Sequence, residues 1–219
     1  MRSKKKRFEE NAHLDTIIEP GKDLFKTVKG QWHTVFGNTN PLHLELACGK
    51  GEYTTGLAPH HPNVNFIGVD VKGDRIWYGA NVARKQGLNN VAFLRTPIQY
   101  LEEFFQEREI EEIWIVFPDP QPKDRNEKHR LTFKTYVDLY KRLLKPGGWI
   151  KLKTDNTLLY EYTLETLQQR DDIEEIIHTP DLYHSDFMPE HFGIVTRFEK
   201  KFFEKGERIK YLKFRFTTP

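Results

Sequence analysis

The sequence has little cysteine and no long apolar run. Cys48 is the single cysteine among 219 residues, which excludes a disulfide framework and a cysteine-rich zinc site. A helix that crosses a bilayer needs about 20 apolar residues, and the sequence contains no such stretch. No apolar segment of a signal peptide follows the basic start either. We therefore expect a cytoplasmic protein with no membrane span and no metal site.

Composition is otherwise ordinary, with 37% hydrophobic and 30% charged residues. This balance at this length favours one large folded α/β domain. The formal net charge is only +2, but basic residues gather at 2–7 and again at 123–134. Clustered charge matters more to a polyanionic partner than the total does. The first cluster is either a solubilising chain end or an arm that touches phosphates.

The most informative stretch is a short strand followed by a glycine turn. Residues 42–47 are mostly apolar, Gly49 and Gly51 follow, and a helix-compatible run begins at Glu52. A strand, a glycine turn and a helix in this order present backbone N–H groups to an anionic ligand. Glu45 is an acid inside the strand, and a buried acid needs a partner. The ammonium group of a methionine-type cofactor would be such a partner.

A second apolar strand at 65–70 ends in Asp70, about 20 residues after the glycines, where an acid binds the ribose of a nucleoside cofactor. The alternative is that Asp70 only caps the next helix. The turn is not a dinucleotide fingerprint, because Thr54 stands where the third glycine would be. It is not a Walker loop either, because the terminal Gly-Lys-Ser/Thr is missing. A dinucleotide oxidoreductase is therefore disfavoured.

Strands and helices alternate along the rest of the chain. Apolar spacing predicts helices at 74–86, 98–108, 131–144 and 158–169, and short apolar runs predict strands at 91–94, 113–117 and 149–154. This alternation predicts a doubly wound, mostly parallel α/β sheet. Residues 173–177 and 209–216 are also strand-like, with a long insert between them. A terminal hairpin with one antiparallel edge strand accounts for them.

Three alternating prolines follow the strand at 113–117. Residues 117–123 read Phe-Pro-Asp-Pro-Gln-Pro-Lys, and the prolines exclude a helix and stiffen the backbone. Open α/β sheets bind ligands at the carboxyl ends of their strands, so this loop would hold the carboxylate of Asp119 in the site. The basic cluster follows directly. Asp155 ends the next strand in the same way, unless it caps the following helix.

These motifs occur together in one protein family. The sequence resembles the bacterial tRNA (guanine-N(7)-)-methyltransferases of the Rossmann-like, S-adenosylmethionine-dependent class, over nearly the whole chain. The proline-acid-proline loop with its basic continuation and a late Thr-x-x-Glu are specific to the family, whereas the glycine turn is shared by the whole class. The segments that carry the resemblance are 32–38 with 40–41, 45–51, 66–70, 117–120 with 122–123, 125–131, 153–156 and 196–202.

The resemblance implies a class I methyltransferase fold, which is a Rossmann-like, doubly wound, mostly parallel α/β sheet of seven strands with one antiparallel edge strand. It implies a basic arm and docked lead-in segment at 1–40 and a methyltransferase domain at 41–219. S-adenosylmethionine is implied as the cofactor and tRNA as the partner of a monomer or homodimer. The implied reaction is methyl transfer to ring nitrogen 7 of a guanine, that of the variable loop.

Site residues are implied by the same resemblance. Asp119 is implied as the catalytic residue. Cofactor contacts are implied for Glu45, Gly49, Gly51, Asp70, Pro97 and Asp119. Substrate contacts are implied for Lys123, Asp155, Thr196 and Glu199.

Four positions depart from the family pattern. Pro97 replaces an acid that contacts the cofactor adenine, and Gln121 replaces an aromatic residue of the proline loop. Ala47 and Cys48 stand where a glycine or another small pair is more usual. We interpret Cys48 as a packed turn residue rather than a nucleophile.

The chemistry of guanine suits these residues. Ring nitrogen 7 has a free lone pair, so no proton must leave before it attacks a sulfonium methyl group and a strong general base is unnecessary. Methylation makes the ring cationic, and the carboxylates of Asp119 and Asp155 would orient the base and offset that charge. Basic residues would attract the RNA backbone. His129 is interpreted as a phosphate contact or a surface residue.

Two other functions remain compatible with the sequence. A methyltransferase that acts on an exocyclic base amine also uses a short proline loop after its fourth strand. A non-catalytic RNA-binding relative is the second alternative, given Pro97 and Gln121. Cofactor titration and analysis of the product nucleoside would separate the three.

Overall fold

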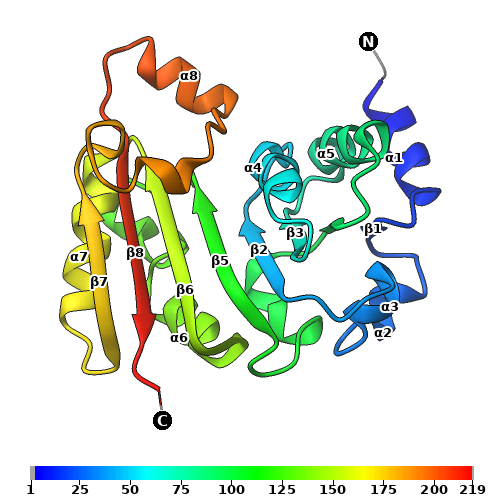
Figure 1. Cartoon of the computed structure of the whole chain (residues 1–219), viewed down its shortest axis with the longest axis horizontal. Helices are drawn as coiled ribbons and strands as arrows, with labels where there is room; N and C mark the ends of the chain where they lie inside the picture. Colours follow the sequence, from blue (N-terminus) through cyan, green and yellow to red (C-terminus); the bar gives the residue numbers. More distant parts are fainter. Residues whose placement is uncertain (1–2, 219) are drawn as a thin grey trace.

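The structure of the chain is a computed structural model that describes residues 3–218 (Figure 1). Within these residues an eight-stranded sheet has the order β1-β4-β3-β2-β5-β6-β8-β7. Its first six strands in that order are parallel, and β8 is antiparallel to both of its neighbours. The strands are β1 Ile17–Ile18, β2 Leu42–Leu46, β3 Asn65–Val69, β4 Val91–Leu94, β5 Ile110–Val116, β6 Leu144–Thr154, β7 Ile173–Thr179 and β8 Lys210–Phe216.

The predicted fold class is confirmed, and the structure refines the edges of the sheet. One strand more than the expected seven is present, because Ile17 and Ile18 pair with Phe93 and Leu94 of β4. Two residues are too few to show an alternation, so β1 has no signal in the sequence. The antiparallel strand is β8, which belongs to the terminal hairpin and lies between β6 and the outermost strand β7.

Helices cover both faces of the sheet. One core lies against α2, α3, η2, α6 and α7, and the other against α4, α5 and the insert that precedes β8. The α-helices are α1 Lys4–Ala12, α2 Leu24–Thr27, α3 Trp32–Phe36, α4 Glu52–Leu57, α5 Gly73–Gln86, α6 Lys134–Leu143, α7 Thr157–Gln168 and α8 Arg197–Phe203. The 3₁₀ helices are η1 Ala58–His60, η2 Ile98–Glu103, η3 Asp124–His129, η4 Leu182–His184 and η5 Met188–His191.

Two predicted helices differ from the structure. The helix predicted at 98–108 is only the 3₁₀ segment η2, and Arg108 is left-handed with φ 56°, which an α-helix cannot contain. The helix predicted from residue 131 begins at Lys134, because the backbone of its N-cap residue Phe133 is extended, with φ −65° and ψ 147°. Pro146 and the glycines after it lie within β6.

The N-terminal segment packs against α5. Asn11 donates its side-chain amide to the Gly73 carbonyl at 2.8 Å, and Arg7 donates to the Tyr78 hydroxyl at 3.1 Å. Lys22 donates to three carbonyls at and just beyond the end of α1. The basic cluster at 2–7 therefore continues into a docked helix from Lys4 onward, while residue 2 lies outside the described range.

No helix in the described range 3–218 is long and apolar enough to cross a membrane.

Candidate active site

The glycine turn after β2 has a left-handed backbone at several positions. Ala47, Gly49 and Gly51 have φ of 53°, 57° and 65°. A side chain on Gly51 would lie 2.5 Å from the Phe93 ring, so packing requires glycine there, whereas the space beside Gly49 is open. The N–H of Gly51 donates to the Cys48 carbonyl at 2.8 Å. Gly49 lines a cavity and Gly51 does not.

Glu45 lies almost fully buried at the end of β2 and lines the same cavity. Its Oε2 accepts the backbone N–H of Thr54 at 2.7 Å and a short hydrogen bond from the Thr54 hydroxyl. Burial raises the pKa of Glu45 to about 8, although the bonds from Thr54 oppose the rise. The carboxyl group therefore holds a proton near neutral pH until a cation replaces it.

Asp70 connects the end of β3 to the glycine turn. Its Oδ2 accepts the N–H of Gly49 at 2.9 Å, and its Oδ1 accepts the N–H of Lys72 at 2.8 Å. The second bond closes a turn before α5, whose N-cap is Lys72 and which has no side-chain cap, so the alternative that Asp70 caps this helix is wrong. Asp70 also lines the cavity.

Pro97 follows β4 and lines the cavity together with Thr96, Ile98 and Gln99. The hydroxyl of Thr96 and the amide of Gln99 are hydrogen-bonding groups, and they stand on both sides of the proline in the sequence. They are the neighbouring groups able to replace the acid that is absent at position 97.

The proline loop places Asp119 in the lining of the cavity. Phe117 and Gln121 have φ of 48° and 47°, and each precedes a proline, which normally imposes an extended backbone. Such strain costs about 1–3 kcal/mol per residue and persists where surrounding contacts fix the loop. Asp119 Oδ1 accepts the N–H of Gln121 at 3.2 Å. Arg130 donates to the Gln121 carbonyl at 3.2 Å and lies 4.3 Å from the Tyr162 ring centroid.

Asp155 and Thr196 complete the lining on this side. Asp155 lines the cavity next to the end of β6, and burial raises the pKa of its carboxyl group. Asn156, not Asp155, caps α7, because its side chain accepts the Leu159 N–H at 2.8 Å. Thr196 is the N-cap of α8 and lines the cavity. Figure 1 shows α8 beyond the carboxyl ends of β5 and β6.

Two residues that the sequence assigned to the substrate do not line the cavity. Lys123 is exposed where the proline loop enters η3. Glu199 is completely buried, so a direct contact between Glu199 and RNA has no support in this structure. The physical reason is an ion pair with Lys153, whose Nζ lies 2.6 Å from Glu199 Oε1. Burial lowers the pKa of Lys153 to about 8, although Glu199 opposes this effect.

The cavity has a volume of about 600 Å³, and its lining includes the acids Glu45, Asp70, Asp119 and Asp155. Sequence reasoning missed several of its features. The support that Thr54 gives to Glu45 was missed, because the sequence showed Thr54 only as a residue that replaces the third glycine of a dinucleotide-binding turn. Phe198 was missed because it occupies a variable position of the Thr-x-x-Glu motif. Tyr136 and Phe202 had no local signal. In the described part of the chain, no cluster of His, Cys, Asp and Glu is suited to hold a metal ion.

Comparison with known proteins gives consistent matches. Residues 39–212 match a family described as putative methyltransferase. A tRNA (guanine-N(7)-)-methyltransferase of Cytophaga hutchinsonii is 45% identical over 216 residues, which cover 98% of both chains. The protein of the same name from Christiangramia forsetii is 42% identical over 221 residues, again with 98% of each chain covered.

Solved structures are similar at much lower identity. A 30S ribosomal A1408 methyltransferase from an uncultured bacterium superposes with a TM-score of 0.61 at 15% identity, covering 86% of this chain and 93% of that one. An antibiotic-related methyltransferase gives a TM-score of 0.60 at 15% identity, covering 84% and 92%. These similarities show the fold alone.

Proposed function

The chain belongs to the tRNA (guanine-N(7)-)-methyltransferase family, and from that premise we propose that it methylates ring nitrogen 7 of the variable-loop guanine of tRNA with S-adenosylmethionine. The observation that carries the proposal is that one cavity is lined by two groups of acids. Glu45 and Asp70 lie beside the glycine turn, and Asp119 and Asp155 follow the neighbouring strands β5 and β6.

The first group fits S-adenosylmethionine. The Glu45 carboxylate is suited to the ammonium group, Asp70 to the ribose hydroxyls, and the open space beside Gly49 to close approach of the ligand. The cavity volume of about 600 Å³ lies within the range of roughly 300–1,000 Å³ for small-molecule sites. Pro97 and its neighbours would receive the adenine. When bound, the cofactor supplies an electrophilic methyl group on a sulfonium.

The second group suits guanine. Asp119 and Asp155 are acceptors for the N–H donors of the base, and they would hold nitrogen 7 toward the methyl group. Because nitrogen 7 attacks through a free lone pair, neither acid must remove a proton first. The ring becomes cationic in the reaction, and preorganised carboxylates stabilise that developing charge. Asp119 is therefore proposed as the catalytic residue, acting through position and charge.

The outer rim suits structured RNA. Basic residues around η3 are exposed, and such charges attract phosphates without reading sequence. The exposed basic residues of this rim are Lys123, Arg125, Lys128 and Lys134, and His129 lies among them. tRNA as substrate agrees with the cytoplasmic location expected from the sequence.

A single substitution tests the assignment of Asp119. Asp119→Ala is expected to lower the methylation rate on the order of 100-fold, the usual cost of losing one preorganised electrostatic partner. Asp124→Ala is the matched control, because Asp124 is an exposed acid of η3 that does not line the cavity. The measurement is digestion of treated tRNA followed by nucleoside mass spectrometry. Near-normal turnover of a folded Asp119→Ala protein would contradict the assignment.

The modified position needs a second measurement. Strand cleavage at 7-methylguanosine maps the methylated nucleotide within the tRNA. Cleavage in the variable loop is the expected result. Methylation of an exocyclic amine, or no methylation with intact cofactor binding, would instead favour one of the two alternative functions.

A further inference from the structure

A buried ion pair joins Lys153 of β6 to Glu199 of α8, behind the wall of the cavity. Both side chains are 0% exposed, and Lys153 Nζ lies 2.6 Å from Glu199 Oε1. Burying two charges costs desolvation free energy, and in the described part of the chain the buried Lys153 Nζ has no hydrogen bond beyond this ion pair. Glu199 is the fully buried residue of α8, so an acid joins the partly buried Phe202 in attaching this helix to the core.

The Glu199 carboxylate connects two further segments and the N-cap of its own helix. Oε1 accepts the Tyr183 hydroxyl of η4 at 2.8 Å and lies 3.1 Å from His191 Nε2 of η5. Oε2 accepts the Thr196 N–H at 3.3 Å, while the Glu199 N–H donates to the Thr196 hydroxyl at 3.1 Å. These two bonds form a capping box. All polar contacts of this acid are therefore with the protein itself.

Lys153 lies directly behind the proposed reaction centre. Its carbonyl accepts the N–H of Phe117 at 2.8 Å, at the start of the loop that carries Asp119. Its ammonium group lies 5.8 Å from the Phe117 ring centroid and 5.1 Å from that of Tyr53. The backbone of Lys153 thus holds the proline loop while its side chain holds α8, and Asp155 lies two residues further along the chain.

The segment held in this way forms one wall of the cavity. Thr196, Phe198 and Phe202 all line it, and the Phe202 ring lies 5.9 Å from that of Phe117. Phe198 is 41% exposed and lines the cavity. Release of α8 would therefore disturb this wall, and α8 touches the cofactor side through the bond from the Arg197 N–H to Glu52 Oε1 at 3.4 Å.

We propose that the Lys153–Glu199 ion pair positions α8, so that Glu199 acts on the reaction through Thr196 and Phe198 and makes no contact with RNA. The inference rests on the proposed function for the identity of the substrate. Glu199 is then a positioning residue, and its negative charge matters because it neutralises a buried ammonium group. Removing either partner leaves the other charge buried and unpaired, whereas removing both charges avoids that cost.

The test compares Glu199→Gln, Lys153→Met and the double variant. Each single variant is expected to raise KM for tRNA at least 10-fold, with cofactor affinity, measured by calorimetry without tRNA, changed by less than about 3-fold. In the double variant, the amide introduced at position 199 can still accept a hydrogen bond from Tyr183 and cap α8. KM for tRNA should therefore return to within about 5-fold of the wild-type value. Glu204→Gln, an exposed acid just after α8, is the control.

The double variant decides the proposal even if a single variant does not fold. Neither Glu199→Gln nor the double variant carries a carboxylate at position 199. If that carboxylate contacts RNA, a folded double variant loses activity as fully as Glu199→Gln does, and this result would overturn the proposal. Unchanged KM and kcat in both folded single variants would overturn it as well.

Limited trypsin digestion separates this inference from the proposed function. Cleavage after Lys200 or Lys201 should be slow in wild type and in the double variant and faster in both single variants, whatever the activity. Wild-type protein that makes no 7-methylguanosine would refute the proposed function. Equal cleavage of all four proteins would refute the positioning role.

Discussion

Glu45 is held by Thr54, the residue that stands where a dinucleotide-binding turn has its third glycine. Thr54 donates both its backbone N–H and its hydroxyl to Oε2 of Glu45, so Oε1 is the oxygen left for a ligand. A glycine at this position would keep only the backbone bond. The departure from the dinucleotide pattern is therefore a feature of this site, since it orients an acid toward the cavity.

Cofactor binding is expected to release a proton from Glu45. Burial raises the pKa of this group to about 8, whereas an unfolded glutamate has a pKa near 4.3. The ligand-free protein should therefore lose stability as the pH rises from about 4 to 8, because the native state retains this proton longer. At pH 7 an incoming ammonium group favours the ionised form and expels the proton.

Calorimetry in buffers of different ionisation enthalpy counts the protons released on cofactor binding. Wild type should release close to one proton more than Glu45→Gln at pH 7. Equal proton release by the two proteins would show that Glu45 is already ionised or that the ammonium group binds elsewhere.

Substitutions of Pro97 test how this protein binds the cofactor adenine, since the acid that the family usually has at this position is missing. A hydrogen bond to a charged acceptor contributes about 1.5–3 kcal/mol, and about 1.4 kcal/mol corresponds to a tenfold change in affinity. Pro97→Asp is therefore expected to tighten cofactor binding roughly 10- to 100-fold. Pro97→Ala removes the ring without adding an acceptor and should give no such gain.

Binding isotherms recorded without tRNA provide the measurement. If folded Pro97→Asp binds the cofactor no more tightly than wild type does, other groups already bind the exocyclic amine of the cofactor adenine. Thr96 and Gln99 are the candidates nearest in the sequence.

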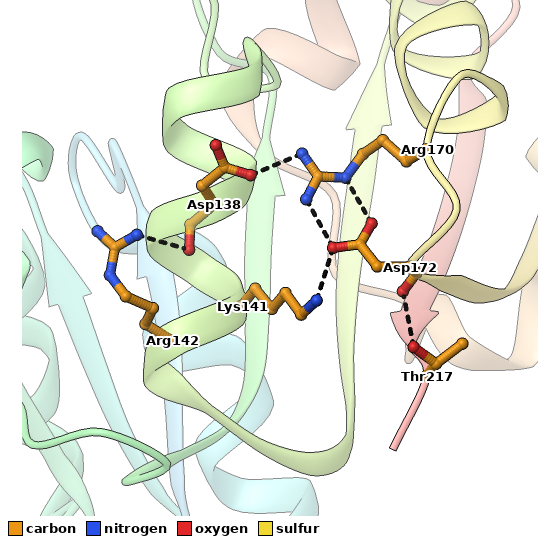
Figure 2. Close-up of polar contacts among 6 residues, drawn as sticks. All are labelled: Asp138, Lys141, Arg142, Arg170, Asp172 and Thr217. Carbon is orange, nitrogen blue, oxygen red and sulfur yellow. Dashed lines mark hydrogen bonds and ion pairs between the residues drawn. The ribbon is translucent and has the colours of Figure 1, made fainter. Parts of the chain in front are cut away.

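At the scale of elements, a cluster of charges joins α6 to the turn between α7 and β7. Figure 2 shows the Asp172 carboxylate between Arg170 and Lys141, with Asp138 on the other side of the guanidinium. Arg170 lies 2.7 Å from both Asp138 and Asp172, and Lys141 lies 2.8 Å from Asp172. The Asp172 carbonyl also accepts the N–H of Thr217 at 3.0 Å. The cluster thus holds α6, the turn and the end of β8 together.

Asp172→Asn is expected to lower the free energy of unfolding by about 1 kcal/mol at pH 7, a value reduced for solvent screening near the surface. Arg170, with help from Lys141, lowers the pKa of Asp172 to about 2, below its unfolded value near 3.9. Its contribution is therefore present above pH 4 and is lost as the pH falls toward 2.

Urea denaturation between pH 7 and 3 measures this effect. Asp171→Asn is the matched control, since Asp171 is the exposed neighbouring acid and should change stability little at any pH. A deficit in Asp172→Asn that stays constant down to pH 3 would contradict the assigned cause.

On the scale of the whole molecule, exposed positive charge lies beside the cavity despite a net charge of only +2. Lys123, Arg125 and Lys128 are exposed around η3. Arg130 belongs to the same cluster in the sequence but is buried and supports the proline loop. The part of the cluster available to phosphates is therefore smaller than the sequence indicated.

Charge reversal of Lys123, Arg125 and Lys128 should weaken tRNA binding and reduce its salt dependence. Removing one phosphate-binding charge lowers the slope of log affinity against log salt concentration by roughly 0.7–0.9. Lys26→Glu on α2 and Lys85→Glu in the last turn of α5 are controls, because both lysines are exposed and neither lines the cavity. Titrations at several salt concentrations give the slopes. Equal slopes for wild type and the triple variant would place the RNA on another face.

Sequence alone determined the features that depend on neighbouring residues. The alternation of strands and helices follows from the period of apolar residues, and the glycine turn and the proline loop follow from backbone preferences. Because the carboxyl ends of parallel strands meet at one edge of the sheet, the order of the motifs also predicted that Glu45, Asp70, Asp119 and Asp155 would line one cavity, as they do.

Only the tertiary structure decided which charged side chains are buried and hold other segments in place. Glu199 and Arg130 have the same local appearance as exposed charged residues, yet both are buried. Their partners, Lys153 and Tyr162, come from other elements of the fold, and no periodicity or spacing identifies such pairs. The position of β8 between β6 and β7 likewise cannot be read from the sequence pattern, since strand order depends on contacts between distant segments.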